Sequence, residues 1–550
     1  SYSYITNDYN YLNGTLYRDE VAEDITYYRP FLVRGYAGYF FSAGEYAKDE
    51  SSQGVYMATY TKDGQLIKSA LFNDNSYKEY VKKVLFTYKS LYIVCNAVDV
   101  SSGDSALLVL RYDMDLVFKA KYIFKPEKYF SPADAVAAVG GVLSKIDEIY
   151  IACSKKDNQK SALAAIHLDS NLNILHSFKY NYTGATDNNI EQPADIDILY
   201  DTITHNTTIY VAGNITGIGG STLTNNLLIK LNGSLKSAWV KANTSANGLY
   251  TSVKQFGAPD YTVYAAGNQL VNTKTKWSID KINPSAGQTL VHKVYAVKSY
   301  QTNVLKITRA ANNIVTVAGY RQSESLNKYD IVVGVYDEDL VNTTNYIIEH
   351  LTYGSSVNDA VQDNDATWIT GKKKNGSNEY IFVYKIDPYS GNSYKDSVVN
   401  TKSAGNCITV LPRVVSYPDS SRIAMCGFKN NSNTLIQPLD LKYTTRFYIP
   451  YLNTIVDKKN EMPAAAQLIN NSPNPFTNST IINYTLPLQY SSARIIITDK
   501  NGKLINESNV SGNGKGSLNF NASLLSNGTY YYTLYVNEKI VATKQMTLIK

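Results

Sequence analysis

The sequence predicts an all-β protein: a β-propeller, with eight blades favoured over seven, followed by a small immunoglobulin-like β-sandwich. Three observations support this prediction. A short strand with a small residue near its end recurs eight times, each copy has the strands of one blade, and the C-terminal segment alternates polar and apolar residues. With 550 residues, the chain is also too long for one hydrophobic core, so we expect at least two domains.

The recurring strand reads, for example, IYVAGNIT or VYAAGNQL. Its copies are spaced 51–60 residues apart, and the small residues are Gly44, Cys95, Cys153, Gly213, Gly267, Gly319, Gly371 and Gly427. A small residue repeated on a strand indicates that another backbone approaches closely. We expect it on an inner strand, where neighbouring blades come close together.

Each repeat contains four short strands, which is the content of one propeller blade. A leading strand such as TSVKQF precedes the small-residue strand, and the third strand ends in Asp or Asn, a residue typical of turns. The first copy has its own leading strand, DITYYRPFLV, and the eighth its own last strand, RFYIPYL, so the propeller is predicted at 25–452. The repeats resemble the β-propeller repeats of secreted bacterial proteins, which implies a fold and no particular activity.

Three further segments complete the predicted organisation. Residues 1–24 read as an extended N-terminal arm, which would either pack on the propeller or pair with the edge strand of another subunit and so form a homo-oligomer. Residues 453–467 are charged and then Pro/Ala-rich, as in a linker. Residues 468–550 alternate in about seven short strands, with the hairpin signal Asn501-Gly502 between two of them.

Composition excludes several classes of protein. Lys and Arg number 53 and Asp and Glu 47, a net charge of +6 without a basic block, so nucleic acid is not an expected partner. No apolar run approaches the ~20 residues of a transmembrane helix. The chain opens on polar residues without a signal peptide, so a secreted protein would be numbered from its mature end. The 48 Tyr and only 18% charged residues are typical of an extracellular all-β protein.

The C-terminal segment carries a recognisable set of motifs: PNPF at 473–476, INYTLP at 482–487, DKNGKLI at 499–505 and a strand pair ending at the terminal lysine. Together they resemble the type A C-terminal sorting domain of type IX secretion. The motif residues are Pro473, Asn474, Pro475, Phe476, Gly502, Gly528, Tyr530 and Lys550.

The resemblance implies a Gram-negative bacterium and a cargo whose C-terminal domain contacts the type IX translocon and its shuttle components. It implies transit through the periplasm and a final place outside the cell or on the outer-membrane surface. Domains of this family are usually cut off after export. The domain is therefore either an export tag or, if retained, a working part of an assembly.

No catalytic constellation stands out. The zinc-protease, serine-hydrolase, Cys-x-x-Cys and P-loop motifs are absent, and so is the Asp-box of sialidases. The Gly-rich NITGIGGST at 214–222 reads as a blade loop. Only two of the five histidines share a blade, so we expect no metal site and no cofactor; the five are His167, His176, His205, His292 and His350.

Acidic residues recur in two settings. Pairs at strand ends favour turn capping over calcium binding; they are Asp113/Asp115, Asp195/Asp197, Asp337/Asp339 and Asp363/Asp365. Asp134, Asp195 and Asp359 recur on leading, channel-side strands. They would line the channel, bind a cation or hold the strands through backbone hydrogen bonds, and we favour the last role.

The four cysteines are too few for a disulfide scaffold. Cys407 and Cys426 fall on adjacent strands of the eighth repeat and are a candidate disulfide. Cys95 and Cys153 occupy equivalent places in neighbouring blades, where we expect small buried packing residues.

The sequence thus favours a non-catalytic secreted or cell-surface propeller that acts in binding, adhesion or extracellular assembly, such as a filament or surface layer. Its ligand would be a glycan or protein bound at a propeller face. The alternative is a secreted polysaccharide-acting enzyme. That function would need carboxylates together with Tyr, His or Arg at the mouth of the channel, supplied by blades far apart in the chain.

Overall fold

The computed structural model describes residues 2–9, 11–12, 15–16, 18–28, 38–47, 53–62, 64–87, 90–124, 132–137, 147–157, 160–182, 189–201, 204–218, 223–243, 247–256, 261–295, 302–309, 314–322, 328–341, 343–352, 355–362, 366–388, 390–398, 403–411, 422–430, 441–450, 466–486, 492–500, 504–512, 514–536 and 539–550. Over these residues the regular structure is built from β-strands, without an α-helix. Two compact units are present, 2–452 and 453–550. Of the predicted linker at 453–467, residues 453–465 lie outside the described residues, and Gln467 begins β35.

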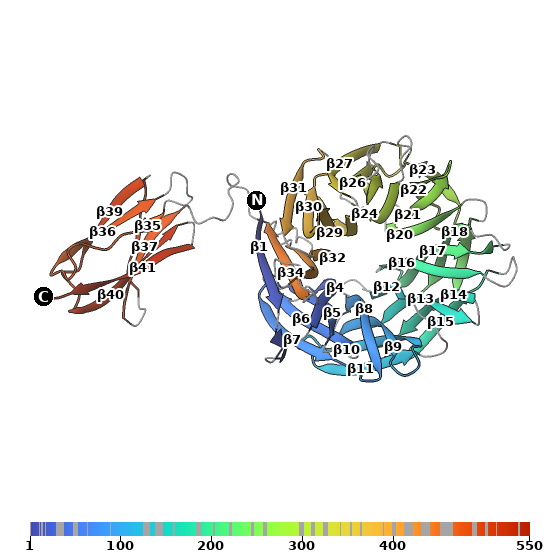
Figure 1. Cartoon of the computed structure of the whole chain (residues 1–550), viewed down its shortest axis with the longest axis horizontal. Coiled ribbons are helices and arrows are strands. Elements are labelled where there is room, and N and C mark those ends of the chain that lie inside the picture. The colour runs from blue at the N-terminus through green and yellow to red at the C-terminus, as the bar shows by residue number, and fades with distance from the viewer. Residues whose placement is uncertain are drawn as a thin grey trace. The chain divides into compact units, whose positions relative to one another are not determined.

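Over the described residues, the first unit is a ring of eight blades, each of four antiparallel strands, and one parallel bridge between Ser161 and Ile190 joins blades three and four (Figure 1). From the innermost strand outward, the first four blades are β4 (Arg18–Tyr28), β5 (Tyr39–Ala47), β6 (Gln53–Thr61) and β7 (Leu66–Phe72); β8 (Tyr77–Phe86), β9 (Leu91–Asp99), β10 (Ser105–Tyr112) and β11 (Phe118–Phe124); β12 (Pro132–Ala137), β13 (Ile149–Asp157), β14 (Lys160–Leu168) and β15 (Ile174–Tyr180); and β16 (Ile190–Asp201), β17 (Asn206–Thr216), β18 (Thr224–Asn232) and β19 (Ser237–Ala242).

Blades five to eight continue in the same order. They are β20 (Gly248–Phe256), β21 (Thr262–Val271), β22 (Lys274–Ile282) and β23 (Thr289–Val294); β24 (Thr302–Arg309), β25 (Val315–Gln322), β26 (Lys328–Tyr336) and β27 (Thr343–Thr352); β28 (Ser356–Gln362), β29 (Thr367–Asn375), β30 (Asn378–Ile386) and β31 (Ser393–Val398); and β32 (Ser403–Leu411), β33 (Arg422–Asn430), β34 (Leu441–Pro450) and β1 (Tyr2–Tyr9). Eight blades are therefore present, as favoured from the sequence.

The ring closes by pairing the two ends of the propeller. β1 is the outermost strand of the eighth blade and pairs with β34, from Tyr2 opposite Pro450 to Tyr9 opposite Tyr443. Of the two roles expected for the segment 1–24, the structure shows packing on the propeller of the same chain. The segment is part of the ring and not a separate domain, because it supplies β1, the short hairpin β2 (Tyr11–Leu12) with β3 (Thr15–Leu16), and the start of β4. One expectation is corrected. The strand RFYIPYL is the third strand of the eighth blade and not the fourth, since β1 takes the outer position.

Every innermost strand carries a one-residue β-bulge, and the recurring small residue lies opposite it. In blade five, Gly267 pairs with Tyr250, and the register then shifts so that Ser252 faces Ala266. The same shift follows the partner of the other seven small residues: Gly44, Cys95, Cys153, Gly213, Gly319, Gly371 and Gly427. The bulge bends the inner strand and redirects the side chain that follows it.

The small residue is needed because the bulged strand of the same blade approaches it. A Cβ on Gly267 would lie 2.0 Å from the carbonyl oxygen of Leu249, and one on Gly213 or Gly371 would lie 2.1 Å from a carbonyl of its own inner strand. The crowding was expected between neighbouring blades, and it arises within one blade instead.

Among the described residues of the propeller, the hydrophobic core is divided into eight clusters, one between each pair of adjacent blades. Phe41 and Val84 belong to the cluster between blades one and two, and Trp368 and Met425 to the one between seven and eight. The cluster between blades eight and one joins Cys426 to Phe40 and so completes the circle. Because each sheet has two apolar faces, it is stable only between two neighbours.

The Asp or Asn that ends many third strands builds the turn to the fourth, as predicted. The Oδ1 atom of Asp113 accepts the backbone N–H of Asp115 (3.0 Å) and of Val117 (2.9 Å), and Asp169 and Asn232 accept the equivalent pair. Each such turn contains a buried leucine with φ of 54–64°; these are Leu116, Leu172, Leu235 and, in blade six, Leu340. Burial of the leucine offsets the cost of its left-handed backbone.

The second unit is a sandwich of two antiparallel sheets. One contains β35 (Gln467–Leu468), β36 (Ser479–Leu486) and β39 (Gly514–Asn521), and the other β38 (Leu504–Asn509), β37 (Ala493–Asp499), β40 (Gly528–Val536) and β41 (Lys539–Leu548). Its core includes Ile482, Ile497 and Tyr532, from alternate positions of their strands. β37 and β38 form the predicted hairpin, whose turn at 501–503 lies outside the described residues.

The bulge arrangement makes a testable prediction. Gly267→Ala should lower the melting temperature of the full-length protein, since its Cβ meets a backbone carbonyl; overpacking of this kind costs about 1–3 kcal/mol. Cys95→Ala at the equivalent place in blade two is the control, because that position already accommodates a Cβ. A Gly267→Ala variant with the same melting temperature as the wild type would contradict this explanation of the repeat.

Candidate functional site

The PNPF segment is attached to the last strand of the second unit. Phe476 is buried in the core, its N–H donates to the Thr547 carbonyl (3.0 Å), and its own carbonyl accepts from Ile549 N–H (2.9 Å). Asn474 extends this pairing with its side chain, accepting from Thr547 N–H (2.9 Å) and donating to the Gln545 carbonyl (3.2 Å). The motif therefore holds the final residues of the chain in a strand-like clamp.

The two prolines of the motif are exposed. The carbonyl of Pro473 accepts from the Thr480 hydroxyl (2.8 Å) and from the Asn471 amide (3.1 Å), so the segment is also tied to β36. Pro475 lies between the two anchoring residues, Asn474 and Phe476. The clamp thus leaves only proline rings and one amide at the surface of the motif.

Lys550, the last residue, is anchored just beyond the same end of β41. Its ammonium donates to the carbonyls of Ser523 (2.6 Å) and Leu525 (2.7 Å), and its N–H donates to Asn527 Oδ1 (2.8 Å). Between the two capped carbonyls, Leu524 is 98% exposed. The terminal lysine therefore holds a turn that presents one bare leucine.

The remaining motif residues continue this turn. Gly528 opens β40, and Tyr530 is buried and donates from its hydroxyl to the Ser526 carbonyl (2.9 Å). Gly502 lies outside the described residues. Each described motif residue thus belongs either to the clamp or to the turn around the C-terminus.

In the propeller, the position directly after each bulge forms an inner ring around the axis. The ring positions in blades one to eight are Asp24, Lys83, Asp134, Asp195, Ser252, Lys306, Asp359 and Cys407. Sequence analysis found three of these. It missed Asp24 although that residue is also an aspartate, and it missed Lys83, Ser252, Lys306 and Cys407 because their residue types differ. The side chain of Asp134 lies outside the described part of β12.

Ring side chains bind the backbone of the next blade. The carboxylate of Asp24 accepts from Val84 N–H (2.6 Å), that of Asp195 from Val253 N–H (2.9 Å), and that of Asp359 from Ile408 N–H (3.0 Å). In each case the donor is the residue after the ring position of the following blade. The prediction that these aspartates hold strands through backbone hydrogen bonds is confirmed for Asp195 and Asp359.

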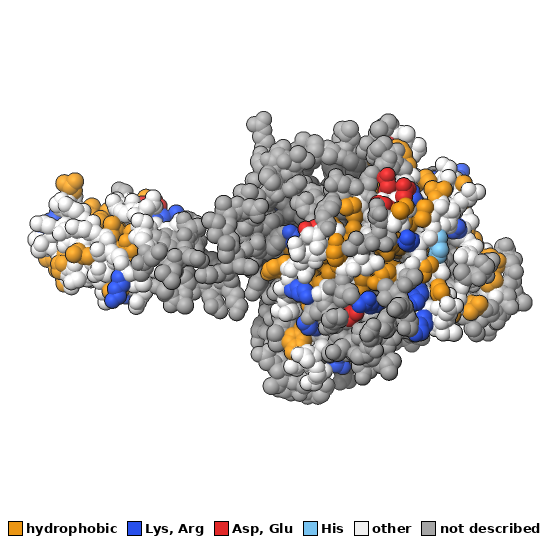
Figure 2. Space-filling model, turned by 90° about the horizontal axis from the view of Figure 1, so that it is seen from above, with side chains coloured by type: hydrophobic (Ala, Val, Ile, Leu, Met, Phe, Trp, Pro, Cys, Tyr) orange, Lys and Arg blue, Asp and Glu red, His pale blue; other side chains and the backbone are white. Residues whose placement is uncertain are grey.

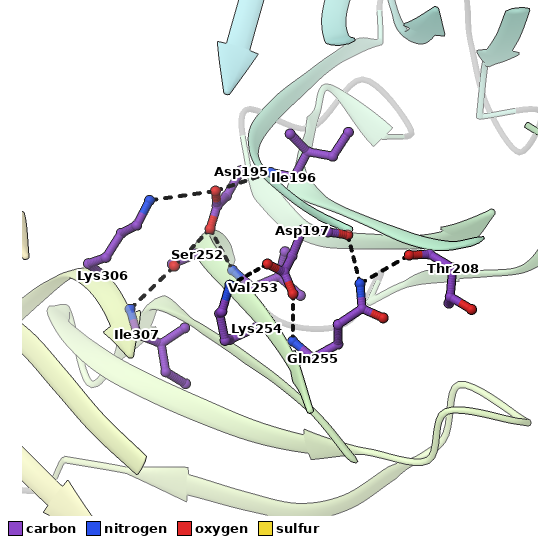
Figure 3. Close-up of polar contacts among 10 residues, drawn as sticks. All are labelled: Asp195, Ile196, Asp197, Thr208, Ser252, Val253, Lys254, Gln255, Lys306 and Ile307. Carbon is purple, nitrogen blue, oxygen red and sulfur yellow. Dashed lines mark hydrogen bonds and ion pairs between the residues drawn. The ribbon is translucent and has the colours of Figure 1, made fainter. Parts of the chain in front are cut away.

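Figure 3 shows how far this network extends between blades four, five and six. Asp195 also accepts from the Ser252 hydroxyl (2.8 Å), which in turn accepts from Ile307 N–H (3.3 Å). The Lys306 ammonium lies 3.7 Å from Asp195 Oδ1. Two residues further along β16, Asp197 accepts from Gln255 N–H (2.8 Å) and from the Lys254 ammonium (2.5 Å). Three blades are therefore joined by polar contacts on their channel side.

At the closure of the ring, a thiol takes the connecting role. Cys407 Sγ lies 2.8 Å from Asp24 Oδ1 and 3.1 Å from Asp359 Oδ2, so blade eight contacts blades one and seven. Cys407 faces Cys426 across β32 and β33, and both are free thiols in the structure. Burial, followed by the nearby Asp24 carboxylate, raises the pKa of each thiol. The cross-strand disulfide stays a prediction.

Blades one and two contain three acids whose pKa is raised by burial. Burial raises the pKa of Glu79 to about 8 and, helped by the charge of Glu23, that of Glu45 to about 8; burial likewise raises the pKa of Glu23 to about 7. Glu79 is fully buried, with one oxygen accepting from Asp74 N–H (2.7 Å) and the other without a hydrogen-bond partner. Sequence reasoning missed these acids because their burial, and the coupling of Glu45 to Glu23, arise only in the folded chain.

The histidines do not all stay apart. His167 on β14 and His176 on β15 are cross-strand partners in blade three, with their Nδ1 atoms 3.0 Å apart. His205 contacts the Tyr200 hydroxyl (2.9 Å) and His292 the Asp280 carboxylate (2.5 Å). His350 lies on β27. Within the described ranges, no group of three or more His, Cys, Asp or Glu converges on a metal position.

The sequence-predicted acidic pairs also have defined places. Asp113 and Asp337 cap turns through Oδ1, the latter accepting from Val341 N–H (2.7 Å), whereas Asp195 and Asp197 join blades. Asp363 and Asp365 lie outside the described residues. A search of the described chain finds no helix with the length and apolar character to cross a membrane.

Comparison with known proteins identifies the second unit. Residues 472–549 match the secretion system C-terminal sorting domain, over the segment that carries the clamp and the terminal lysine. A search of curated proteins finds no match.

Solved structures similar to this chain include several propellers. The β-propeller domain of the Trilobed protease from Pyrococcus furiosus is 8% identical, covering 66% of this chain and 93% of that chain with a TM-score of 0.36. The WD40 domain of SCAP from fission yeast is 8% identical, covering 81% and 98% with a TM-score of 0.38. A family PL25 ulvan lyase is 7% identical, covering 66% and 90% with a TM-score of 0.41. At these scores the propeller assignment depends on the strand order above.

The fold and the sorting motif together define a propeller protein with a C-terminal export signal. The second unit belongs to the secretion system C-terminal sorting domains, and the protein is a cargo of type IX secretion. It is therefore exported to the cell surface or the extracellular space.

Glu79 makes stability depend on pH. A carboxyl whose pKa is about 8 when folded and 4.5 when unfolded stabilises the fold fully below pH 4.5, and this contribution is lost as the pH rises through 8. Glu79→Gln keeps the neutral form, so it should melt close to the wild type at pH 5 and several degrees higher at pH 9. Equal melting temperatures at both pH values would show that Glu79 ionises freely.

Lys550 should stabilise the sorting domain. Lys550→Ala removes two charge-assisted hydrogen bonds to carbonyls that are near solvent, and we expect it to cost about 1–2 kcal/mol in the thermal unfolding of that domain. Lys515→Ala, an exposed lysine on β39, is the control. If the two variants unfold at the same temperature, Lys550 does not stabilise the domain.

Proposed function

We propose that the protein is a non-catalytic propeller exported by a Gram-negative bacterium, and that its outer surface binds a glycan or protein in adhesion or extracellular assembly. The observation that carries this proposal is the composition of the outer strands of blades one to five. They contain six lysines and no Asp or Glu; the lysines are Lys68, Lys119, Lys121, Lys179, Lys241 and Lys293. Lys119 and Lys121 form ion pairs with Asp113 and Asp74, which neutralise part of this charge. An anionic glycan is the ligand class that best complements the remaining excess of lysine on these strands.

Exposed apolar side chains accompany the lysines. The outer strands of several blades have large hydrophobic residues more than one third exposed; these are Leu66, Ile67, Phe118, Ile174, Leu175, Val240 and Leu290. On the face seen in Figure 2, hydrophobic side chains lie among those of Lys and Arg, and those of Asp and Glu are fewer. Mixed apolar and cationic surface of this kind supports contact with another macromolecule.

The inner ring supports a structural role for the channel strands. The carboxylates of Asp24, Asp195 and Asp359 accept backbone N–H groups of the next blade. A carboxylate committed to a neighbouring strand has less freedom to act on a substrate.

In the assembly form of this proposal, β1 pairs with β34 of a second copy rather than with its own. The pairing is antiparallel over eight residues and closes the ring without a covalent bond, which favours exchange between identical chains. A mass that rises with protein concentration, and falls when residues 2–9 are deleted, would support the exchange.

A second candidate function, action on a polysaccharide, is favoured by one observation. Glu23 and Glu45 are partly exposed, have raised pKa values and influence each other, as expected for a general acid. In this case Glu45→Gln would abolish release of sugar products from a polysaccharide.

The proposal is tested by binding of the full-length protein to immobilised polygalacturonate and dextran sulfate, with neutral dextran for comparison. We expect binding to the two anionic polymers that weakens with salt and falls at least tenfold in a Lys241→Glu/Lys293→Glu variant. Lys500→Glu/Lys515→Glu makes the same charge change in the other unit and is the control. Equal binding by both variants would overturn the proposal that lysines of the outer strands bind the ligand. Breakdown of the polymer that Glu45→Gln prevents would establish the enzyme instead.

A further inference from the structure

His292 lies at the outer edge of the interface between blades four and five. It is on β23 opposite Asp280 of β22, which in turn pairs with Ala265 of β21. Cross-strand partners project from the same face of a sheet, and Ala265 belongs to the apolar cluster that blade five forms with blade four. The side chains of His292 and Asp280 therefore point towards blade four, with that of His292 44% exposed and that of Asp280 buried.

Asp280 holds the ring of His292 in one orientation. Its Oδ1 atom lies 2.5 Å from His292 Nδ1, and its Oδ2 atom accepts from the Tyr250 hydroxyl. Nδ1 therefore donates to the buried carboxylate, which leaves Nε2 for a ligand. The hydrogen bond to Asp280 raises the pKa of His292 above its ordinary value, although partial burial lowers it. Near neutral pH, the imidazole is thus a cation more often than that of a free histidine.

Lys241 provides a second cation at the same place. It lies on β19, the outer strand of blade four, opposite Leu228, which belongs to the same apolar cluster. Its side chain therefore projects towards blade five, and its ammonium is near enough to oppose, in part, the effect of the Asp280 hydrogen bond on the pKa of His292. In the described part of the chain, Lys241 forms no ion pair. Two positively charged groups therefore meet where blades four and five reach the solvent.

Other titratable groups border this interface, and they are Tyr210 on β17, Lys230 on β18, Tyr250 on β20 and Lys276 on β22. The Lys230 ammonium donates to the Pro284 carbonyl (2.7 Å). Burial raises the pKa of both tyrosines, whose hydroxyls therefore stay neutral, and burial lowers the pKa of Lys276. The charge of His292 is controlled by Asp280 and Lys241.

An aromatic ring lies beside the two cations. Trp239 is two residues before Lys241 on the same face of β19, and it is half-buried. Its Nε1–H donates to the Pro284 carbonyl (3.2 Å), and a Cβ on Gly287 would lie 2.8 Å from its indole, so the turn of blade five packs against the ring. The indole is therefore fixed in place. Charged groups next to a fixed aromatic surface suit a sugar that carries a negative charge.

We propose that His292 and Lys241 form a subsite for one carboxylate or sulfate group of an anionic glycan, with Trp239 beside the sugar ring. His292 Nε2–H and the Lys241 ammonium donate to the anion, while the buried Asp280 carboxylate keeps the imidazole protonated. The subsite rests on the proposed function and adds to it a pH dependence that lysines do not give near neutral pH. Binding is strongest while His292 is charged, and it weakens as the pH rises and the imidazole loses its proton.

The test is binding of the full-length protein to polygalacturonate and to dextran sulfate at pH 6 and pH 8.5, at constant ionic strength. We expect the wild type to bind about three- to tenfold more tightly at pH 6, because one charge-assisted contact is added. His292→Gln should bind equally at both pH values. The control is His205→Gln, an exposed histidine whose partner is the Tyr200 hydroxyl, and it should keep the wild-type ratio. The two polymers show whether the subsite takes carboxylate, sulfate or both.

Two spectroscopic measurements report on the subsite directly. With isotope-labelled histidines, inorganic sulfate at pH 6 should shift the nuclear magnetic resonance signal of His292, and Asp280→Asn should lower the pKa of that imidazole. Polymer binding should also change the tryptophan fluorescence, and Trp239→Phe should remove this change, because Trp277 and Trp368 are fully buried. Circular dichroism establishes that each variant is folded.

The outcomes separate the subsite from the proposed function. Polymer binding that keeps its pH dependence in His292→Gln would overturn the subsite and leave the proposed function intact. A His292 signal that ignores sulfate, or that titrates alike in the wild type and Asp280→Asn, would overturn the subsite as well. Absence of polymer binding, with the sulfate shift of His292 retained, would support the subsite and overturn the proposed function.

Discussion

The propeller depends on one local constraint, the bulge in each innermost strand. The bulge needs a partner with little or no side chain, which is why Gly or Cys recurs in the second strand of all eight blades. In return, it turns the following side chain towards the next blade, where Asp24, Asp195 and Asp359 accept a backbone N–H. One backbone irregularity therefore explains both the sequence repeat and the polar contacts between blades.

The bulge is compatible with different residue types at the ring position that follows it. A carboxylate, a hydroxyl and a thiol all make interblade contacts there, in Asp195, Ser252 and Cys407. Apolar packing between blades provides the larger stabilisation, and the ring contacts set the register of one inner strand against the next. Closure by β1 is of a different kind, since it adds an outer strand and no inner contact.

The sequence was sufficient for the fold class, the number of blades and the sorting domain, because each rests on a local pattern repeated or clustered along the chain. It was insufficient for β1, since pairing between residues 2–9 and 443–450 leaves no periodic signal. The inner ring was only partly found: Asp134, Asp195 and Asp359 were recognised by their shared residue type, Asp24 was missed although it has the same type, and Lys83, Ser252 and Cys407 share only a register with them. The pairing of His167 with His176 depends on strand register in the same way.

In this propeller, inner strands near the axis have structural roles, and outer strands are available for recognition. Inner strands commit their polar side chains to neighbouring blades, so substitutions there act on stability first. Outer strands have one free edge, and their side chains are exposed or partly exposed, so lysines, apolar residues and His176 can be replaced there at little cost to the core. New binding properties in such a protein are therefore expected to arise on the outer strands, while the bulged inner strands keep the same structure.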